Sequence, residues 1–296
     1  MNALCFVVFS HGMTHTLRSM VDATRAGARQ VMDVYAGAID VDMKADNSPL
    51  TEADRRSHEA IVSALEASVP TVPILSEEGA HEDHGVRTAW ERYFLIDPLD
   101  GTKEFIKRNG EFTVNVALVE RNQESGVWEP TAGVVYAPEL GELFVGSPDG
   151  AYLWTDVFVN ESEPVVPAIE TALPLPRPDR RTGRPYTVVA SRSHMSPETE
   201  QFIDNRRRVH PDLTLISAGS SLKLCRVADG SADVYPRFAP TMEWDTGAGD
   251  AVARAAGCTV QAWDANTGRA GSALEYNKQD LHNPWFLVTT QEGLHQ

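Results

Sequence analysis

The chain has 296 residues, enough for one large or two ordinary domains, and its 42% hydrophobic and 23% charged residues are typical of a globular protein. Its formal net charge of -16 repels nucleic-acid backbones and anionic lipid, which excludes a nucleic-acid polymer as the expected partner. A small phosphorylated ligand stays possible, because a bound divalent cation reverses the sign of the local field.

The three cysteines, Cys5, Cys225 and Cys258, have no short paired spacing. The sequence therefore predicts neither a disulfide framework nor a zinc ribbon, and a cytoplasmic protein is expected. The apolar run at residues 3–9 is too short to span a bilayer, so no transmembrane segment is expected, and loose association with the inner face of the cell membrane is left open. We predict that residues 1–12 are an N-terminal extension.

The first half of the chain predicts helices followed by a sheet. Apolar residues recur at three- and four-residue steps over 17–35, the period of an amphipathic helix, and Thr51 is a good N-cap for a second helix that ends at Pro70. Apolar runs then predict strands at 72–75, 93–96, 113–119, 133–136, 143–145 and 152–154.

Frequent prolines and missing apolar periodicity predict a linker over 161–185, between an N-terminal α+β domain (13–160) and a C-terminal α/β domain (186–296). In the second domain strands are expected at 186–190, 213–217, 232–235, 258–263 and 286–289, and helices from Ser196, over 220–228 and over 246–256. This alternation indicates that both domains share a layered αβαβα arrangement.

The densest chemical signal is Asp97-Pro98-Leu99-Asp100-Gly101-Thr102, directly after the predicted strand 93–96. Two acids at a strand end, three positions apart, can aim both carboxylates at one point, and hard cations such as Mg²⁺ need oxygen ligands of that kind. Gly101 permits close approach of the backbone, and Thr102 can begin a helix whose N–H groups would receive a phosphate. A plain turn followed by an N-cap would use the same residue types.

Other acids stand at element ends. Glu77 follows the strand 72–75, and parallel placement of that strand would bring Glu77 toward Asp97. Asp245 precedes the helix 246–256, where an acid alone is more often a cap than a ligand. Asp54 has the capping-box spacing from Thr51, or else its carboxylate pairs with the hydroxyl of Thr102, which then orients an attacking water.

Basic residues after the motif, Lys103, Lys107 and Arg108, would add positive charge for a doubly phosphorylated ligand, or would only form a solvated helix face. His194 is likewise open between a substrate contact and a structural use.

The chain resembles the inositol monophosphatase superfamily of lithium-sensitive phosphatases in the order of its motifs. These are an acid, then Glu-Glu, then Asp-Pro-Leu-Asp-Gly-Thr, then Trp-Asp. Within that superfamily the chain is most similar to the CysQ-type 3'(2'),5'-bisphosphate nucleotidases, from about residue 23 to about residue 286. The supporting stretches are Lys44–Pro49, Leu75–Glu78, Asp97–Phe112, Ser191–His194, Gly219–Lys223 and Tyr235–Phe238.

The resemblance implies the layered αβαβα sugar-phosphatase fold and a site for two or three Mg²⁺ ions. Glu77, Asp97 and the carbonyl of Leu99 would hold one ion, and Asp97, Asp100 and Asp245 would hold the second.

The resemblance also implies catalytic and substrate-binding residues. Asp54, Glu77 and Thr102 would position and activate the water, and the amides of Gly101 and Thr102 would accept the phosphate. The full substrate-binding set that it implies is Glu77, Leu99, Asp100, Gly101, Thr102, Ser220, Lys223, Arg237 and Asp245.

The implied reaction is Mg²⁺-dependent hydrolysis of the 3'-phosphate of adenosine 3',5'-bisphosphate to AMP and phosphate, without a covalent phosphoenzyme. Action on 3'-phosphoadenylyl sulfate and a place in sulfur assimilation are also expected. Two sister enzymes, an inositol monophosphatase or a fructose-1,6-bisphosphatase, would share the metal site. A Mg²⁺-dependent ligand-binding regulator without turnover is the non-enzyme alternative, and the oligomeric state is left open.

Overall fold

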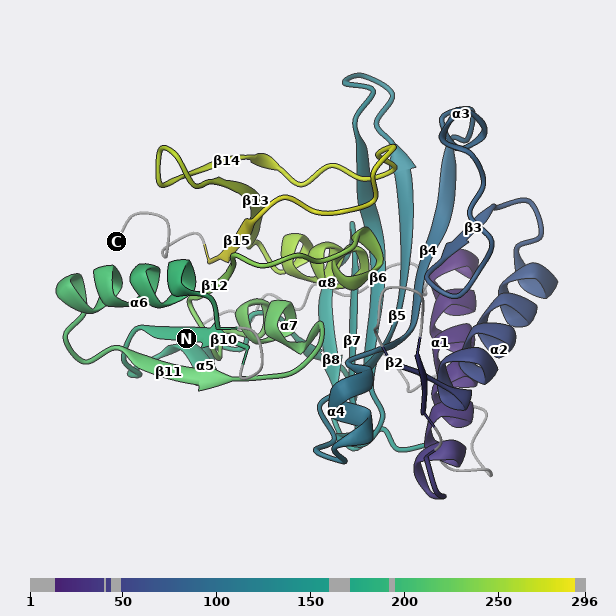
Figure 1. Ribbon diagram of the computed structural model, residues 1–296, viewed down its shortest axis with the longest axis horizontal. Helices are drawn as coiled ribbons and strands as arrows, with labels where there is room; N and C mark the ends of the chain where they lie inside the picture. Colours follow the sequence, from purple (N-terminus) through teal and green to yellow (C-terminus); the bar gives the residue numbers. More distant parts are fainter. Residues whose placement is uncertain (1–13, 40, 44–48, 160–170, 192–194, 291–296) are drawn as a thin grey trace, which may run out of the picture.

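The computed structural model describes residues 14–39, 41–43, 49–159, 171–191 and 195–290. The predicted N-terminal extension 1–12, His194 and most of the stretch Lys44–Pro49 lie outside these residues. The described chain forms five layers, with two outer helix layers, two sheets and a central helix layer between the sheets (Figure 1). The layered αβαβα arrangement predicted from the sequence is confirmed.

The described helices are α1 (His15–Tyr35), α2 (Glu52–Ser68), α3 (His84–Arg87), α4 (Thr102–Ile106), α5 (Pro178–Arg181), α6 (Pro197–Val209), α7 (Leu222–Ala228) and α8 (Glu243–Ala255). The seven-stranded sheet has the order β3 (Ile74–Ser76), β4 (Arg92–Asp100), β5 (Thr113–Arg121), β6 (Trp128–Ala137), β7 (Glu142–Ser147), β8 (Gly150–Trp154) and β9 (Leu173–Pro174). The six-stranded sheet has the order β11 (Thr214–Ser217), β10 (Thr187–Ala190), β12 (Val234–Arg237), β15 (Phe286–Thr289), β13 (Thr259–Asp264) and β14 (Arg269–Ala273). A separate two-stranded sheet pairs β1 (Val41–Met43) antiparallel with β2 (Pro49–Thr51).

The two faces of the seven-stranded sheet bury different clusters of side chains. On β5, Val114, Val116 and Leu118 pack with α1 and α2, whereas the intervening Ala117 and Val119 belong to the core shared with α7, α8 and the second sheet. This follows from the two-residue period of a strand. Further out, α6 packs Phe202 and Ile203 against the opposite face of the six-stranded sheet.

Helix α8 lies in the central layer and approaches the seven-stranded sheet very closely (Figure 1). A Cβ atom added to Gly133 on β6 would lie 2.3 Å from the main-chain oxygen of Ala248, and one added to Gly146 on β7 would lie 2.5 Å from Cα of Val252. Only glycine leaves room for the helix backbone at these two places. The close packing brings the first turn of α8 next to the end of β4.

The segment predicted as a linker, 161–185, contains secondary structure from residue 171 onward. Strand β9 pairs with β8 at the edge of the seven-stranded sheet. Helix α5 follows, and Arg180 forms an ion pair with the buried Asp229 at the end of α7. These residues are therefore tied to both halves, and the two-domain division stays a prediction.

Further elements that the sequence patterns did not indicate are strand β14, the short helix α3 and the two-stranded sheet of β1 and β2. In the described part of the chain, no helix is both long and apolar enough to cross a membrane.

Candidate active site

Parallel pairing of β3 and β4 brings two acidic strand ends together, as the sequence predicts. Ser76 lies opposite Ile96 in this register, and the main-chain N–H of Glu77 donates to the carbonyl of Ile96 at 3.1 Å. By alternation along β4, Asp97 follows Tyr93 and Leu95 onto the face that packs against α8.

The structure corrects one expectation about the Asp97–Asp100 motif. Strand β4 does not end at Ile96 but continues through the motif to Asp100, and its register with β5 is irregular between Asp97 and Asp100. In a regular strand, residues three positions apart point to opposite faces. The local irregularity lets both carboxylates reach the same side of the sheet.

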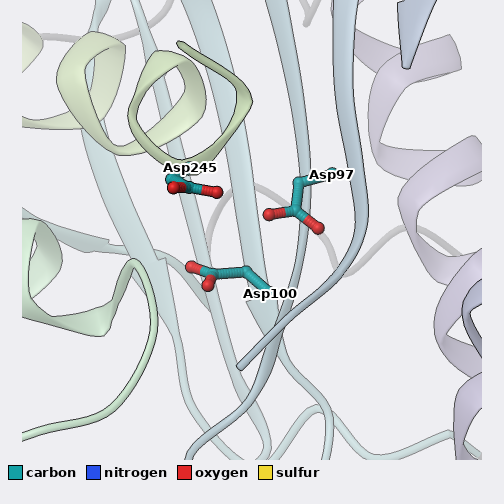
Figure 2. Close-up of side chains that lie close together, drawn as sticks. All are labelled: Asp97, Asp100 and Asp245. Carbon is teal, nitrogen blue, oxygen red and sulfur yellow. The ribbon is translucent and has the colours of Figure 1, made fainter. Parts of the chain in front are cut away.

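Asp245 also lies differently from the prediction, because α8 begins at Glu243 and not at residue 246. Asp245 is therefore inside the first turn, and its Oδ2 accepts a hydrogen bond from the main-chain N–H of Met242 at 2.8 Å. The capping interpretation is correct, yet the same carboxylate also joins a cluster. Asp97, Asp100 and Asp245 each offer an oxygen within 4.8 Å of the others. Figure 2 shows these three side chains close together.

Burial and mutual repulsion make this cluster unfavourable without a counter-charge. Burial, followed by the negative charges of Glu77, Asp100 and Asp245, raises the pKa of Asp97 well above its usual value. Burial and the charge of Asp100 raise the pKa of Asp245 to about 8. A divalent cation would offset both effects, since it is a strong local positive charge.

The residues present fit a hard cation. The Oδ2 atom of Asp97, a residue that is 1% exposed, has no hydrogen-bond partner among the described residues. Every side-chain atom that the cluster offers to a metal ion is a carboxylate oxygen, which is the ligand type that Mg²⁺ prefers.

Asp54 makes both of the contacts that the sequence left open. Its Oδ2 accepts from the main-chain N–H of Thr51 at 2.7 Å, which completes the capping box of α2. Its Oδ1 lies 3.4 Å from Oγ1 of Thr102, the first residue of α4. The same Oγ1 is also 3.4 Å from the carbonyl oxygen of Leu99. One carboxylate thus joins the start of α2 to the Asp97–Thr102 motif.

A cavity of about 270 Å³ opens in front of the cluster. Its lining includes most of the predicted site residues, namely Glu77, Asp100, Gly101, Thr102, Ser220, Lys223, Arg237 and Asp245. Asp54, Asp97 and Leu99 are buried and are not among the lining residues.

Two basic side chains line the same cavity as the carboxylates. Lys223 is 5% exposed, its Nζ donates to the carbonyl of Ser220 at 2.6 Å, and burial lowers its pKa to about 8. Arg237 donates through Nη2 to the carbonyl of Pro240 at 2.9 Å, while its buried Nε has no hydrogen-bond partner among the described residues. An anion bound here would satisfy that donor.

The three basic residues after the motif have different positions. Lys103 lines the cavity, whereas Lys107 does not. Arg108 instead donates to the carbonyl of Tyr35 at 2.6 Å and lies over the ring of Tyr35. Arg108 is therefore not part of a solvated helix face, since it lies beyond α4 and binds the end of α1.

Sequence reasoning missed Ser221, Thr113 and Asn115, which lie directly behind the site. Ser221 Oγ is 2.9 Å from Oδ2 of Asp100, and Asn115 Nδ2 donates to Ser221 at 3.0 Å. The signal was present, because Thr113 and Asn115 are polar residues at alternate positions of the otherwise apolar run 113–119.

The chain belongs to the inositol monophosphatase family, because the model of that family matches residues 13–294. Within that family it is similar to the 3'(2'),5'-bisphosphate nucleotidase CysQ of Escherichia coli O157:H7. The two are 41% identical over 276 residues, which cover 92% of this chain and 99% of that protein.

Two solved structures share the fold of this chain. The crystal structure of CysQ from Bacteroides thetaiotaomicron is 46% identical, has a TM-score of 0.80 and covers 93% of this chain and 97% of its own. The Thermotoga maritima IMPase, at 21% identity and a TM-score of 0.66, covers 95% of this chain and 96% of its own and shares the fold.

Proposed function

We infer that this protein is a Mg²⁺-dependent 3'(2'),5'-bisphosphate nucleotidase that hydrolyses adenosine 3',5'-bisphosphate to AMP and phosphate. The similarity to the CysQ nucleotidases over most of both chains supports this substrate class. Action on 3'-phosphoadenylyl sulfate and a place in sulfur assimilation are part of the same proposal.

One observation carries the proposal: acids from a carboxylate cluster and two basic side chains line one cavity. Asp100 and Asp245 belong to the acidic part of its lining, which we call the carboxylate wall, and Lys223 and Arg237 belong to the basic part, which we call the cationic wall. A substrate with a single phosphate needs only the first wall, whereas a bisphosphate can place its second phosphate against the second.

We assign the divalent cations to Glu77, Asp97, Asp100, Asp245 and the carbonyl of Leu99, with two or three ions in total. When bound, such cations neutralise charge on the transferred phosphoryl group and promote ionisation of a water. Uncatalysed hydrolysis of phosphate monoesters is among the slowest biological reactions, so a large electrostatic contribution is required.

The protein's own groups orient the attacking water. If Thr102 Oγ1 donates its proton to Oδ1 of Asp54, its lone pairs are left to accept a hydrogen bond from a water. Glu77, which lines the same cavity, is our candidate for accepting the second proton of that water. The nucleophile is thus held by two protein oxygens before it attacks the phosphorus in line.

The main-chain amides of Gly101 and Thr102 are assigned to the oxygens of the scissile phosphate. Gly101 has a φ of +88°, and a Cβ atom there would lie 3.3 Å from Cβ of Ser220. A side chain at this position would be strained and would crowd the cavity wall, so glycine keeps the amide accessible.

A substrate panel tests the proposal. Phosphate release is measured with adenosine 3',5'-bisphosphate, inositol 1-phosphate and fructose 1,6-bisphosphate, with Mg²⁺ and with added Li⁺. We expect the highest kcat/KM for the nucleotide, loss of activity without Mg²⁺ and inhibition by Li⁺. Preference for either sugar phosphate would refute the substrate assignment, and Mg²⁺-dependent ligand binding without turnover would indicate a regulator.

A further inference from the structure

Four buried polar residues form a layer between the carboxylate cluster and the core. They are Thr113, Asn115, Ser220 and Ser221, which we call the polar layer, and each is at most 8% exposed. In the register of β4 and β5, Asp97 lies opposite Asn115 and Asp100 lies opposite Thr113. Buried polar groups cost free energy unless they are hydrogen-bonded, so their contacts require an explanation.

The hydrogen bonds of this layer converge on one oxygen of Asp100. Ser220 Oγ donates to Oδ2 of Asp100 at 2.7 Å, and Ser221 Oγ lies 2.9 Å from the same oxygen. Thr113 Oγ1 is hydrogen-bonded to Ser220, and Asn115 Nδ2 donates to Ser221. The side chains on β5 thus support both serines from behind.

Ser221 also contacts the helix that carries Asp245. Its Oγ lies 2.7 Å from the main-chain oxygen of Asp245, and a hydroxyl has one proton and two lone pairs. Because Asn115 supplies a donor to Ser221, the proton of Ser221 is directed to Asp100 or to Asp245. One side chain therefore contacts both β4 and the first turn of α8.

We propose that Ser221 is a positioning residue, which orients the carboxylate of Asp100 for the divalent cation and aligns β4 with α8. The inference rests on the proposed function, because it concerns the same cation site. Since both hydroxyls converge on Oδ2, we assign Oδ1 to the cation. Neutral hydroxyl donors leave the carboxylate its full negative charge, whereas a lysine or arginine in their place would compete with the cation.

The test measures Mg²⁺ binding directly, by calorimetry on the full-length protein without substrate. We expect Ser221→Ala to weaken Mg²⁺ binding by about 10-fold or more, the usual effect of removing a group that orients a metal ligand. Ser221→Cys, which keeps the approximate size but donates weakly, should lose affinity in the same way. Ser19→Ala is the matched control, since Ser19 is also buried and donates to a helix carbonyl, that of His15 at 3.0 Å.

Melting temperatures in EDTA separate positioning from a structural role. If Ser221→Ala and Ser221→Cys lower the melting temperature but bind Mg²⁺ like the unaltered protein, the inference is overturned. Should Ser221→Ala fail to fold, Ser221→Cys decides by the same criterion. The substrate panel on the unaltered protein separates the two proposals, because a sugar-phosphate preference refutes the nucleotide assignment while leaving an affinity loss in the Ser221 variants intact.

Discussion

The two walls of the cavity differ in how they are built. The carboxylate wall comes from neighbouring elements of the first sheet, β3 and β4, joined by the first turn of α8. The cationic wall comes from the second half, where Lys223 lies on α7 and Arg237 at the end of β12. The carboxylates are crowded and repel one another, whereas the buried Nε of Arg237 has no partner in the part of the chain that the structure describes.

This difference indicates that each wall needs a different ligand. Clustered acids are stabilised by a divalent cation, and buried basic groups are stabilised by an anion. A bisphosphate with bound Mg²⁺ satisfies both walls at once. Variants of one wall should therefore affect catalysis, and variants of the other should affect the choice of substrate.

The largest effect is expected from Asp100→Asn on the carboxylate wall. Loss of this charge should lower kcat/KM by about 10³-fold or more, or about 4 kcal/mol in the activation barrier. The fold should persist, because a like-charged neighbour is removed from Asp97 and Asp245. Steady-state kinetics and melting in EDTA measure both effects, and the exposed Asp212→Asn is the control. Normal turnover in Asp100→Asn would reject the metal role.

A smaller and more selective effect is expected from Arg237→Met on the cationic wall. Losing a charged hydrogen bond should raise KM for adenosine 3',5'-bisphosphate by roughly 10- to 100-fold. For 3'-AMP, which lacks the 5'-phosphate, KM should change little. Arg207→Met, on the exposed side of α6, should leave both values unchanged. An equal rise in KM for both substrates would show that Arg237 does not recognise the second phosphate.

The smallest effect is a pH dependence that comes from Lys223. Burial lowers its pKa from 10.5 to about 8, so the amine carries a positive charge below pH 8 and loses that charge above pH 8. KM for the bisphosphate should therefore rise several-fold as pH increases from 7 to 9, and Lys223→Met should remove this dependence. Between pH 8 and 10.5 the unfolded chain binds the proton that the native chain lacks, so stability should increase with pH in that window. A pH-independent KM in the unaltered protein would contradict this assignment.

The sequence predicted the carboxylate wall better than the cationic wall for a physical reason. Asp97 and Asp100 are three residues apart in one motif, and parallel strands bring their carboxyl ends together, so Glu77 could be placed next to Asp97. Lys223 and Arg237 were assigned only through family resemblance, because no local period brings α7 and β12 to the same cavity.

Some elements could not be predicted because tertiary contacts decide them. The regular strand 93–96 was expected to end before Asp97, but pairing with β5 extends β4 to Asp100. Strand β9 depends on pairing with β8 and lies within a proline-rich stretch that reads as a linker. Ser221 was missed because its role depends on Asp100 and Asp245, which are distant in sequence.

The most direct measurement of the central claim is anomalous scattering from crystals soaked in Mn²⁺, which prefers the same oxygen ligands as Mg²⁺. The account predicts anomalous peaks within coordination distance of carboxylate oxygens of Asp97, Asp100 and Asp245. Mn²⁺ bound only elsewhere, with these three carboxylates contacting no ion, would contradict it.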